Sequence, residues 1–190
     1  FVSPVSGEVT EITRGDKRRV LEVKIKADKI QTYFDHKKIE IKSAKRDTIK
    51  AKLLASGCWP FITQRPYDVI ANPENTPKGI FISAYASAPL AADYNFVLTG
   101  KQAELQAAVT ALSKLTTGKV NVSVPKDSHS PFTNLEDVVT HKVSGPHPSG
   151  NVGTLINKID PVNKGEIVWT LTPQDLVIIG EVLLTGKFNA

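Results

Sequence analysis

The sequence predicts a protein of the α+β or α/β class in two parts, a small β module over residues 1–45 and a three-layer α/β domain over residues 46–190. In the first part, Leu21, Val23 and Ile25 stand two residues apart, which is the period of a half-buried strand. In the second part, short apolar runs typical of strands alternate with runs that have helical spacing. This alternation is typical of a layered α/β domain.

The β module contains two strand-like runs joined by a turn. Residues 8–12 alternate weakly and residues 20–26 alternate strictly, while residues 14–17 have the composition of a turn. Residues 39–41 predict one further short strand. Because two or three strands cannot enclose a hydrophobic core, we expect them to pair with strands outside this sequence.

The α/β domain is predicted to begin with a helix over residues 48–56, with Asp47 as its N-cap. Residues 57–68 are rich in aromatic side chains and interrupted by proline, which predicts an irregular segment. The last helix has the strongest start signal, with Thr172 as the N-cap and Pro173 at the first helical position. The other elements predicted are strands at 79–84, 119–124, 138–143 and 166–171, and helices at 101–117 and 151–159.

The positive charge is concentrated near the start of the chain. Residues 14–52 hold 14 of the 24 Lys and Arg residues and six acids, a net charge of +8. Residues 53–190 hold 10 basic and 11 acidic residues. A basic segment attracts nucleic acid, anionic lipid or an acidic protein, or it is simply a solvated strand face. Because no recognition motif accompanies the charge, we expect no nucleic acid partner and keep a membrane-surface or protein contact open.

Composition excludes several other classes of function. The sequence has no apolar run long enough to span a membrane and no signal-peptide pattern. Cys58 is the only cysteine, which excludes a disulfide within the chain, fits a reducing compartment and predicts a buried structural thiol. The four histidines lack carboxylates at ligand spacing, so no metal site is expected. No serine lies in a nucleophile motif, so no catalytic residue is predicted.

A turn rich in glycine and proline joins the strand at 138–143 to the next helix. Such a turn is the usual place for an anion in an α/β domain, because backbone N–H groups and the helix dipole point there. Pro146 and Pro148 have no N–H to donate, however, and each restricts the residue before it. Residues 144–151 therefore predict a rigid structural turn and not a phosphate site, with His147 fixing the loop by a hydrogen bond.

The aromatic segment after residue 57 is the other candidate site. Its flat side chains, with a polar amide and a guanidinium close by, are suited to a quinone or nucleotide ring. They are equally suited to plugging a cavity or to a contact with another protein of a complex. The residues of this candidate quinone or nucleotide region are Trp59, Phe61, Gln64, Arg65 and His147.

An ordered series of short motifs lies at residues 3–9, 57–60, 64–66, 88–91, 115–120, 145–150, 160–162 and 174–186. This series resembles the A subunit of the bacterial Na⁺-translocating NADH:quinone oxidoreductase along essentially the whole chain. The resemblance implies a partial barrel-sandwich (lipoyl-like) module over 1–45, a Rossmann-like domain over 46–190, and a longer protein of which this is an interior piece.

The resemblance also implies a role. The family member is the peripheral part, on the cytoplasmic face of the inner membrane, of a complex that uses NADH, flavins and quinone and exports Na⁺. Its partners would be the other subunits, especially a membrane-embedded one. The chain would contribute to assembly and to quinone access without being catalytic by itself. The alternative is a flavin- or NADH-binding redox domain of an Rnf-like electron-transport complex.

The resemblance further implies that a flavin site has been filled. Related flavoprotein subunits of complex I and Rnf have a glycine-rich flavin loop resembling G-R-G-G-A-G-F-P. Here the corresponding residues are Gly57-Cys58-Trp59-Pro60-Phe61, and a Trp indole would block the approach of the flavin ring. The β module also lacks an Asp-Lys-Ala carrier lysine. We therefore expect no cofactor on this chain.

Overall fold

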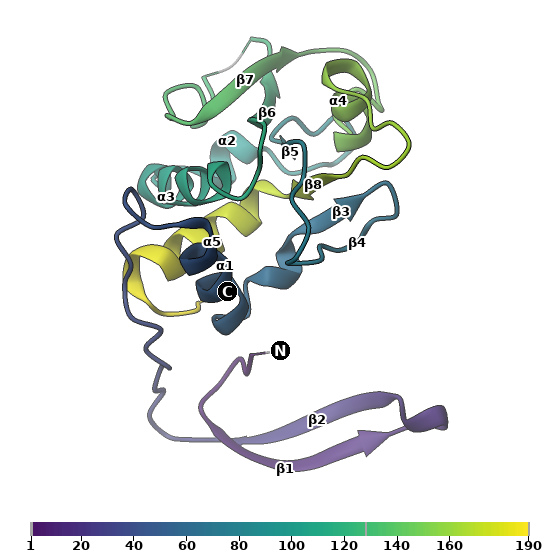
Figure 1. Ribbon diagram of the computed structural model, residues 1–190. Coiled ribbons are helices and arrows are strands. Elements are labelled where there is room, and N and C mark those ends of the chain that lie inside the picture. The colour runs from purple at the N-terminus through teal and green to yellow at the C-terminus, as the bar shows by residue number, and fades with distance from the viewer. Residues whose placement is uncertain (1, 128, 190) are drawn as a thin grey trace.

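The computed structural model describes residues 2–127 and 129–189. A long two-stranded ribbon stands apart from a layered α/β domain (Figure 1). The ribbon consists of β1 (Gly7–Arg14) and β2 (Val20–Ala27), which pair antiparallel and are joined by the 3₁₀ turn η1 (Asp16–Arg18). Both predicted strands of the β module are thus present and extend slightly beyond their predicted limits.

The ribbon leaves its apolar residues exposed within the described part of the chain. Val9, Ile12, Leu21 and Val23 are each about half exposed. They belong to positions that alternate with charged residues such as Lys24, so the ribbon has an apolar and a charged side. The period-2 pattern therefore predicted the strands correctly, whereas none of the described elements buries the apolar side.

The third strand predicted for the β module is wrong. Residues 39–41 form no strand; Ile39 and Ile41 instead pack as partly buried side chains against the core of the α/β domain. Two apolar residues separated by one polar residue occur both in strands and at the edge of a hydrophobic core. In this chain, packing against the core determines the conformation of residues 39–41.

The α/β domain is built on a six-stranded sheet in the order β4-β3-β8-β5-β6-β7. The four strands β8, β5, β6 and β7 are parallel, and β3 and β4 extend the sheet antiparallel beyond β8. From β5 the chain first adds strands on one side and then returns to add β8 on the other. This is the order of half a Rossmann sheet. The strands are β3 (Thr63–Arg65), β4 (Val69–Ile70), β5 (Ile80–Ser83), β6 (Val120–Pro125), β7 (Val138–Val143) and β8 (Val168–Leu171).

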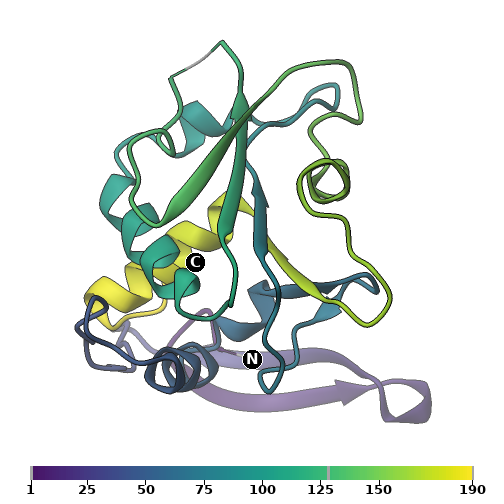
Figure 2. The same cartoon turned by 45° about the horizontal axis from the view of Figure 1, so that its top comes forward.

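Helices cover the sheet unequally and complete three layers. Three helices, α1, α3 and α5, lie on one face, and α4 lies on the other (Figure 2). The fold class is therefore the predicted one, a β module followed by a Rossmann-like three-layer domain. The helical segments are α1 (Arg46–Ala55), η2 (Trp59–Phe61), α2 (Tyr94–Val97), α3 (Gln102–Ser113), α4 (Val152–Ile159) and α5 (Pro173–Thr185).

The α5 helix starts and ends as its sequence predicts. The Thr172 hydroxyl accepts a hydrogen bond from the Asp175 N–H, and the Asp175 carboxylate accepts one from the Thr172 N–H. This reciprocal pair is a capping box. Gly186 ends the helix in the left-handed conformation, with φ of 77°.

Two local predictions in the first half of the domain are wrong. The α1 helix begins at Arg46, and Asp47 lies in its first turn, so the N-cap residue is Lys45, which makes no side-chain cap. Residues 57–68 are not irregular, because they contain η2 and the short strand β3. A three-residue strand has no pattern of its own; Thr63–Arg65 is extended because β8 supplies its partners.

Candidate functional site

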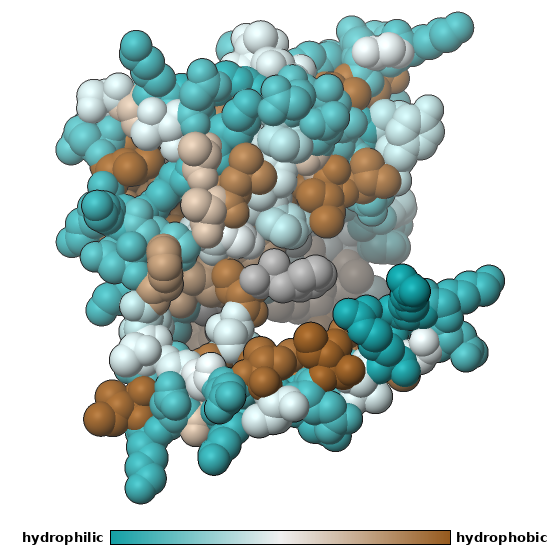
Figure 3. All heavy atoms as spheres, turned by 60° about the horizontal axis from the view of Figure 1, so that its bottom comes forward, coloured by the Kyte–Doolittle hydropathy of each residue, from teal (hydrophilic) through white to brown (hydrophobic). Residues whose placement is uncertain are grey.

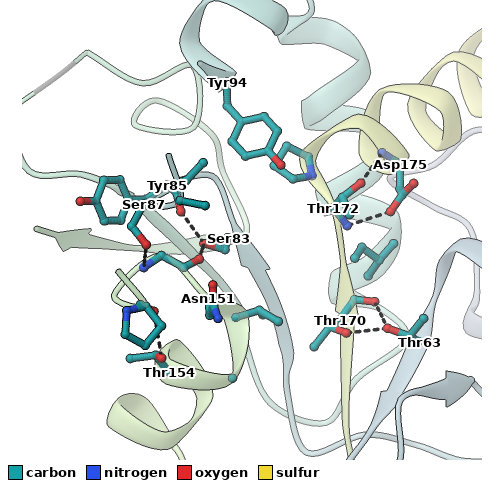
Figure 4. Close-up of a pocket in the computed structure, with 18 of the residues that line it drawn as sticks. Thr63, Ser83, Tyr85, Ser87, Tyr94, Asn151, Thr154, Thr170, Thr172 and Asp175 are labelled. Atoms are coloured by element: carbon teal, nitrogen blue, oxygen red, sulfur yellow. Dashed lines mark hydrogen bonds between the residues drawn. The ribbon is translucent and has the colours of Figure 1, made fainter. Parts of the chain in front are cut away.

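A cleft of about 760 Å³ opens at the carboxyl edge of the sheet, where β5 and β8 end (Figure 4). After β5 the chain adds β6 and β7 on one side, and β8 then pairs with β5 on its other side, so the strand order reverses between β5 and β8 and their carboxyl ends flank a crevice. This is the topological switch point at which open α/β sheets bind ligands. The lining comes from β3, from the ends of β5 and β8, from residues 85–88, and from the first turns of α4 and α5.

Hydroxyl groups form the floor of the cleft. Thr63 Oγ1 lies 2.6 Å from Thr170 Oγ1 across the β3–β8 pair, and Ser83 Oγ lies 2.9 Å from Ser123 Oγ across the β5–β6 pair. Strands covered on both faces are usually apolar throughout. The two hydroxyl pairs are therefore unusual for such a sheet, and they give this edge a polar surface.

Hydrogen bonds fasten one wall of the cleft. The Ser83 hydroxyl donates to the Gly150 carbonyl (2.6 Å), and the Gly150 N–H donates to Ser87 Oγ (2.8 Å). The Tyr85 hydroxyl donates to the Gly145 carbonyl (2.9 Å). These contacts hold the loop after β5 against the turn before α4, so that this wall is preformed.

The backbone of the same turn is already engaged. The N–H groups of Ser149 and Asn151 donate to carbonyls within the turn, and that of Gly150 donates to Ser87. A Cβ on Gly150 would lie 2.4 Å from the Tyr85 carbonyl oxygen, so only glycine fits there. With two prolines and three occupied amides, the turn cannot form a nest of donors for a phosphate.

The start of α4 offers the remaining backbone donors. Val152 and Gly153 line the cleft, and as the first two helical residues they have no acceptor for their N–H groups inside the helix. The opposite wall presents Arg65, whose Nε lies 3.3 Å from Asp68 Oδ1. Donors therefore face the cleft from both sides.

The structure separates the five residues predicted for the site. Phe61 and Arg65 line the cleft. His147 is not among the lining residues, but its Nδ1 lies 3.2 Å from Oγ of the lining residue Ser87, which is the loop-fixing contact predicted for it. Trp59 and Gln64 do not belong to the lining.

Trp59 is a core residue. It is 4% exposed, its Nε1–H donates to the Ala71 carbonyl (2.7 Å), and its ring meets Trp169 edge-on at 5.5 Å between centroids. Gln64 Oε1 accepts hydrogen bonds from Asn75 Nδ2 (3.2 Å) and Trp169 Nε1 (3.4 Å). Both residues therefore support the sheet beneath the site.

Sequence reasoning missed most of the cleft. The hydroxyl residues and Asp175 were absent from the predicted site because they are scattered over 110 residues. One signal was available: polar residues stand at the ends of two buried strands, Ser83 as the last residue of 80–83 and Thr172 directly after 168–171, where a parallel sheet has its carboxyl edge. The residues missed are Thr63, Ser83, Tyr85, Ser87, Tyr94, Thr170, Thr172 and Asp175.

Burial shifts the protonation of three groups. Burial raises the pKa of the Asp175 carboxyl, and its two hydrogen bonds with Thr172 oppose this shift only in part. Burial lowers the pKa of His141, whose Nε2 lies 3.0 Å from Asn121 Oδ1. Burial raises the pKa of the Cys58 thiol, which is fully buried and thus a structural thiol, as predicted.

Among residues 2–127 and 129–189, no three His, Cys, Asp or Glu side chains are grouped so that they could hold a metal ion. Over the same residues, every helix is too short or too polar to cross a bilayer.

Fold and site together define a Rossmann-type α/β domain with a switch-point cleft, preceded by a β ribbon. Family models refine this class. Residues 44–188 match the NqrA second alpha/beta domain, and residues 1–28 match the NqrA N-terminal barrel-sandwich hybrid domain. The chain therefore belongs to the NqrA family, which confirms the resemblance seen in the sequence.

Curated relatives agree with this assignment. Proteins named as the A subunit of Na(+)-translocating NADH-quinone reductase are 36% identical in Saccharophagus degradans and 35% in Histophilus somni, each over 98% of this chain and 42% of the relative. The protein of that name in Klebsiella pneumoniae is 34% identical over 100% of this chain and 43% of the relative. The chain thus spans about two fifths of the length of these relatives.

Proposed function

We propose that this chain is part of the peripheral NqrA component of a Na⁺-translocating NADH:quinone oxidoreductase, on the cytoplasmic face of the bacterial inner membrane. There it contributes to assembly with the other subunits, above all with a membrane-embedded one. The observation that carries the proposal is the similarity along at least 98% of the chain to relatives that bear the name of this component. The complex supplies NADH, flavins, quinone and Na⁺, and this chain carries no redox cofactor of its own.

The cleft extends this role to quinone access. A quinone headgroup is a flat ring with two carbonyl acceptors. The lining offers the flat side chains of Phe61 and Tyr94, and the Arg65 guanidinium as a donor. A cleft of about 760 Å³ falls within the usual range for a small-molecule site.

Kinetics of the assembled complex test quinone access. Arg65→Gln in NqrA removes the charged donor, and we expect the KM for quinone to rise at least about tenfold, the loss of one charge-assisted hydrogen bond. Lys158→Gln, an exposed change on α4, is the matched control and should leave KM unchanged. An unchanged KM for Arg65→Gln in a fully assembled complex would contradict quinone access.

Assembly is tested separately. The purified chain, immobilised through its C-terminus, should retain the membrane-embedded subunit from detergent extracts of cells that express the complex. Failure to retain any subunit of the complex would contradict the docking role, whatever the quinone kinetics show.

A flavin- or NADH-binding redox domain is the second candidate. The position of the cleft favours it, since nucleotides bind at the switch point in this class of fold. The engaged amides of residues 149–151 and the core position of Trp59 argue against it. Titration calorimetry with FMN and NADH decides: we expect no tight stoichiometric binding, and a one-to-one complex would favour this candidate.

A further inference from the structure

We propose that the tip of the β ribbon, residues 14–20, binds an anionic phospholipid surface. The inference deepens the proposed function, because it rests on the peripheral placement of the chain and names the surface that one part of it contacts.

The first step is the distribution of the basic residues. The segment 14–52 carries a net charge of +8, but the structure does not gather this charge into one patch. Lys24 pairs with Glu11 at 2.9 Å, and Lys50 pairs with Glu74 at 3.3 Å. Other cations are bound to backbone carbonyls: Arg46 donates to Leu115 and Asn75, and Lys52 to His36 and Lys37.

Several other lysines of this segment also form no ion pair among the described residues, but the ribbon tip gathers four cations within six residues. Arg14, Lys17, Arg18 and Arg19 are exposed, and Asp16 is the single acid among them, so the tip has a net charge of +3. None of these four cations forms an ion pair with any described residue. The charges of Lys17, Arg18 and Arg19 are therefore available to an outside partner, whereas the Arg14 guanidinium also donates to a carbonyl of the tip.

The backbone of the tip is held in an uncommon conformation. Lys17 and Arg18 have φ of 53° and 62°, the left-handed region that such residues rarely adopt. Two hydrogen bonds hold it: Gly15 N–H to the Arg19 carbonyl (2.8 Å) and Arg14 Nη1 to the Arg18 carbonyl (3.1 Å). A costly conformation kept at an exposed basic turn is consistent with a functional role.

Position makes the tip accessible. It lies at the end of the ribbon far from the α/β domain (Figure 1), and hydrophilic side chains extend from that end (Figure 3). Hydrophobic side chains lie along the part of the ribbon nearer the domain, so the tip is chemically distinct from the rest of the ribbon. A flat surface can approach the tip without meeting the domain.

The chemistry favours lipid headgroups over a protein carboxylate cluster. Four long cationic side chains on a narrow turn form no pocket and fix no geometry, and mobile headgroups can rearrange to meet them. Val20, 48% exposed, directly follows Arg19 and stands on the charged side of the ribbon, where it adds an apolar contact at the interface. Anionic leaflets attract such basic segments in proportion to the number of cations.

Vesicle binding tests the proposal with the purified 190-residue chain. We expect it to co-sediment with vesicles of phosphatidylcholine containing phosphatidylglycerol, and not with phosphatidylcholine alone. Raising the salt concentration should release it, because screening weakens the attraction. Inorganic phosphate at matched ionic strength should not compete, which distinguishes a charged surface from a site for free phosphate.

Variants locate the contact. A triple variant should have a vesicle–water partition coefficient lower by on the order of 100-fold, about fivefold for each cation removed. Its changes are Lys17→Gln, Arg18→Gln and Arg19→Gln. The matched control removes three exposed lysines of the α/β domain, Lys119, Lys158 and Lys164, by the same change to Gln. It should lower partitioning less than about threefold, because these lysines lie outside the tip.

Three outcomes would overturn the proposal: equal binding to neutral vesicles, equal losses in the two triple variants, or no binding by the parent chain at low salt. If the chain still retains the membrane-embedded subunit in such a case, this inference fails while the proposed function stands. Selective recognition of that subunit through the tip, without vesicle binding, would assign the cations to a protein contact instead.

Discussion

The two faces of the six-stranded sheet have different chemistry, although the same strands build both. Trp169 and Thr170 are neighbours on β8; Trp169 is fully buried in the core formed with α3 and α5, and Thr170 lies in the cleft floor. The other face has only a small second core of Phe81, Val168 and residues of α4. Concentrating apolar packing on one face leaves the carboxyl edge of the other free to hold polar groups.

The largest effect should come from the core face. Trp169→Ala removes the biggest fully buried side chain, and we expect the free energy of unfolding to fall by about 3–5 kcal/mol. Thr170→Val, its control on the cleft face, loses one hydroxyl hydrogen bond and should cost about 1 kcal/mol. Urea unfolding measures both. Similar losses would mean that the cleft floor is a second packing core.

A pair of helical glycines sharpens the same comparison. A Cβ on Gly180 of α5 would lie 2.0 Å from the Glu104 carbonyl oxygen of α3, whereas a Cβ on Gly153 of α4 would meet nothing within 4 Å. Gly180→Ala should therefore destabilise the protein by about 1–3 kcal/mol. Gly153→Ala should stabilise it by about 0.5–1 kcal/mol, because alanine favours a helix. Thermal unfolding of both variants decides, and a neutral Gly180→Ala would contradict close packing of α3 on α5.

The fastened wall of the cleft should respond more weakly. Ser87→Ala removes the acceptor of the Gly150 N–H and the partner of His147, and we expect a loss of about 1 kcal/mol. Amide exchange at Gly150 should accelerate, while amides of α5 keep their protection. Ser43→Ala, at an exposed turn, is the control and should change neither. Unchanged exchange at Gly150 would show that the wall does not depend on this contact.

The smallest effect concerns pH. Burial raises the pKa of Asp175 above that of the unfolded chain, so the folded state binds this proton more tightly. The resulting stabilisation is fully present below the ordinary pKa of Asp and is lost as pH rises through the raised value. In Asp175→Asn, this part of the pH dependence should vanish. Urea unfolding of parent and variant from acidic to neutral pH gives the difference curve, and a flat curve would contradict the prediction.

The sequence predicted those features that depend on neighbours along the chain. The capping box of α5 depends on Thr172 and Asp175, three residues apart, and the turn before α4 depends on Pro146 and Pro148, which have no N–H to donate. Strand β2 followed from strict alternation. The series of motifs identified the family, because each motif lies in sequence whatever its place in space.

The predicted site was less accurate, since its residues were chosen mainly from one continuous segment. Side chains that alternate along a strand point to opposite faces, so Gln64 supports the sheet while Arg65 next to it reaches the cleft. Trp59, whose bulk suggested a filled ligand site, is buried in the main core.

The sequence by itself determined the four long helices α1, α3, α4 and α5, the four parallel strands β5 to β8, and the family of this protein. Only the tertiary structure decided the order of the strands, the pairing of β3 with β8, and the cleft that brings Thr63, Ser83 and Thr170 together. It also decided which cations of the basic segment have an acidic partner, as Lys24 and Lys50 do. The physical reason is range: caps, turns and periodicity act over a few residues, whereas a cleft and an ion pair depend on which distant segments the fold places side by side.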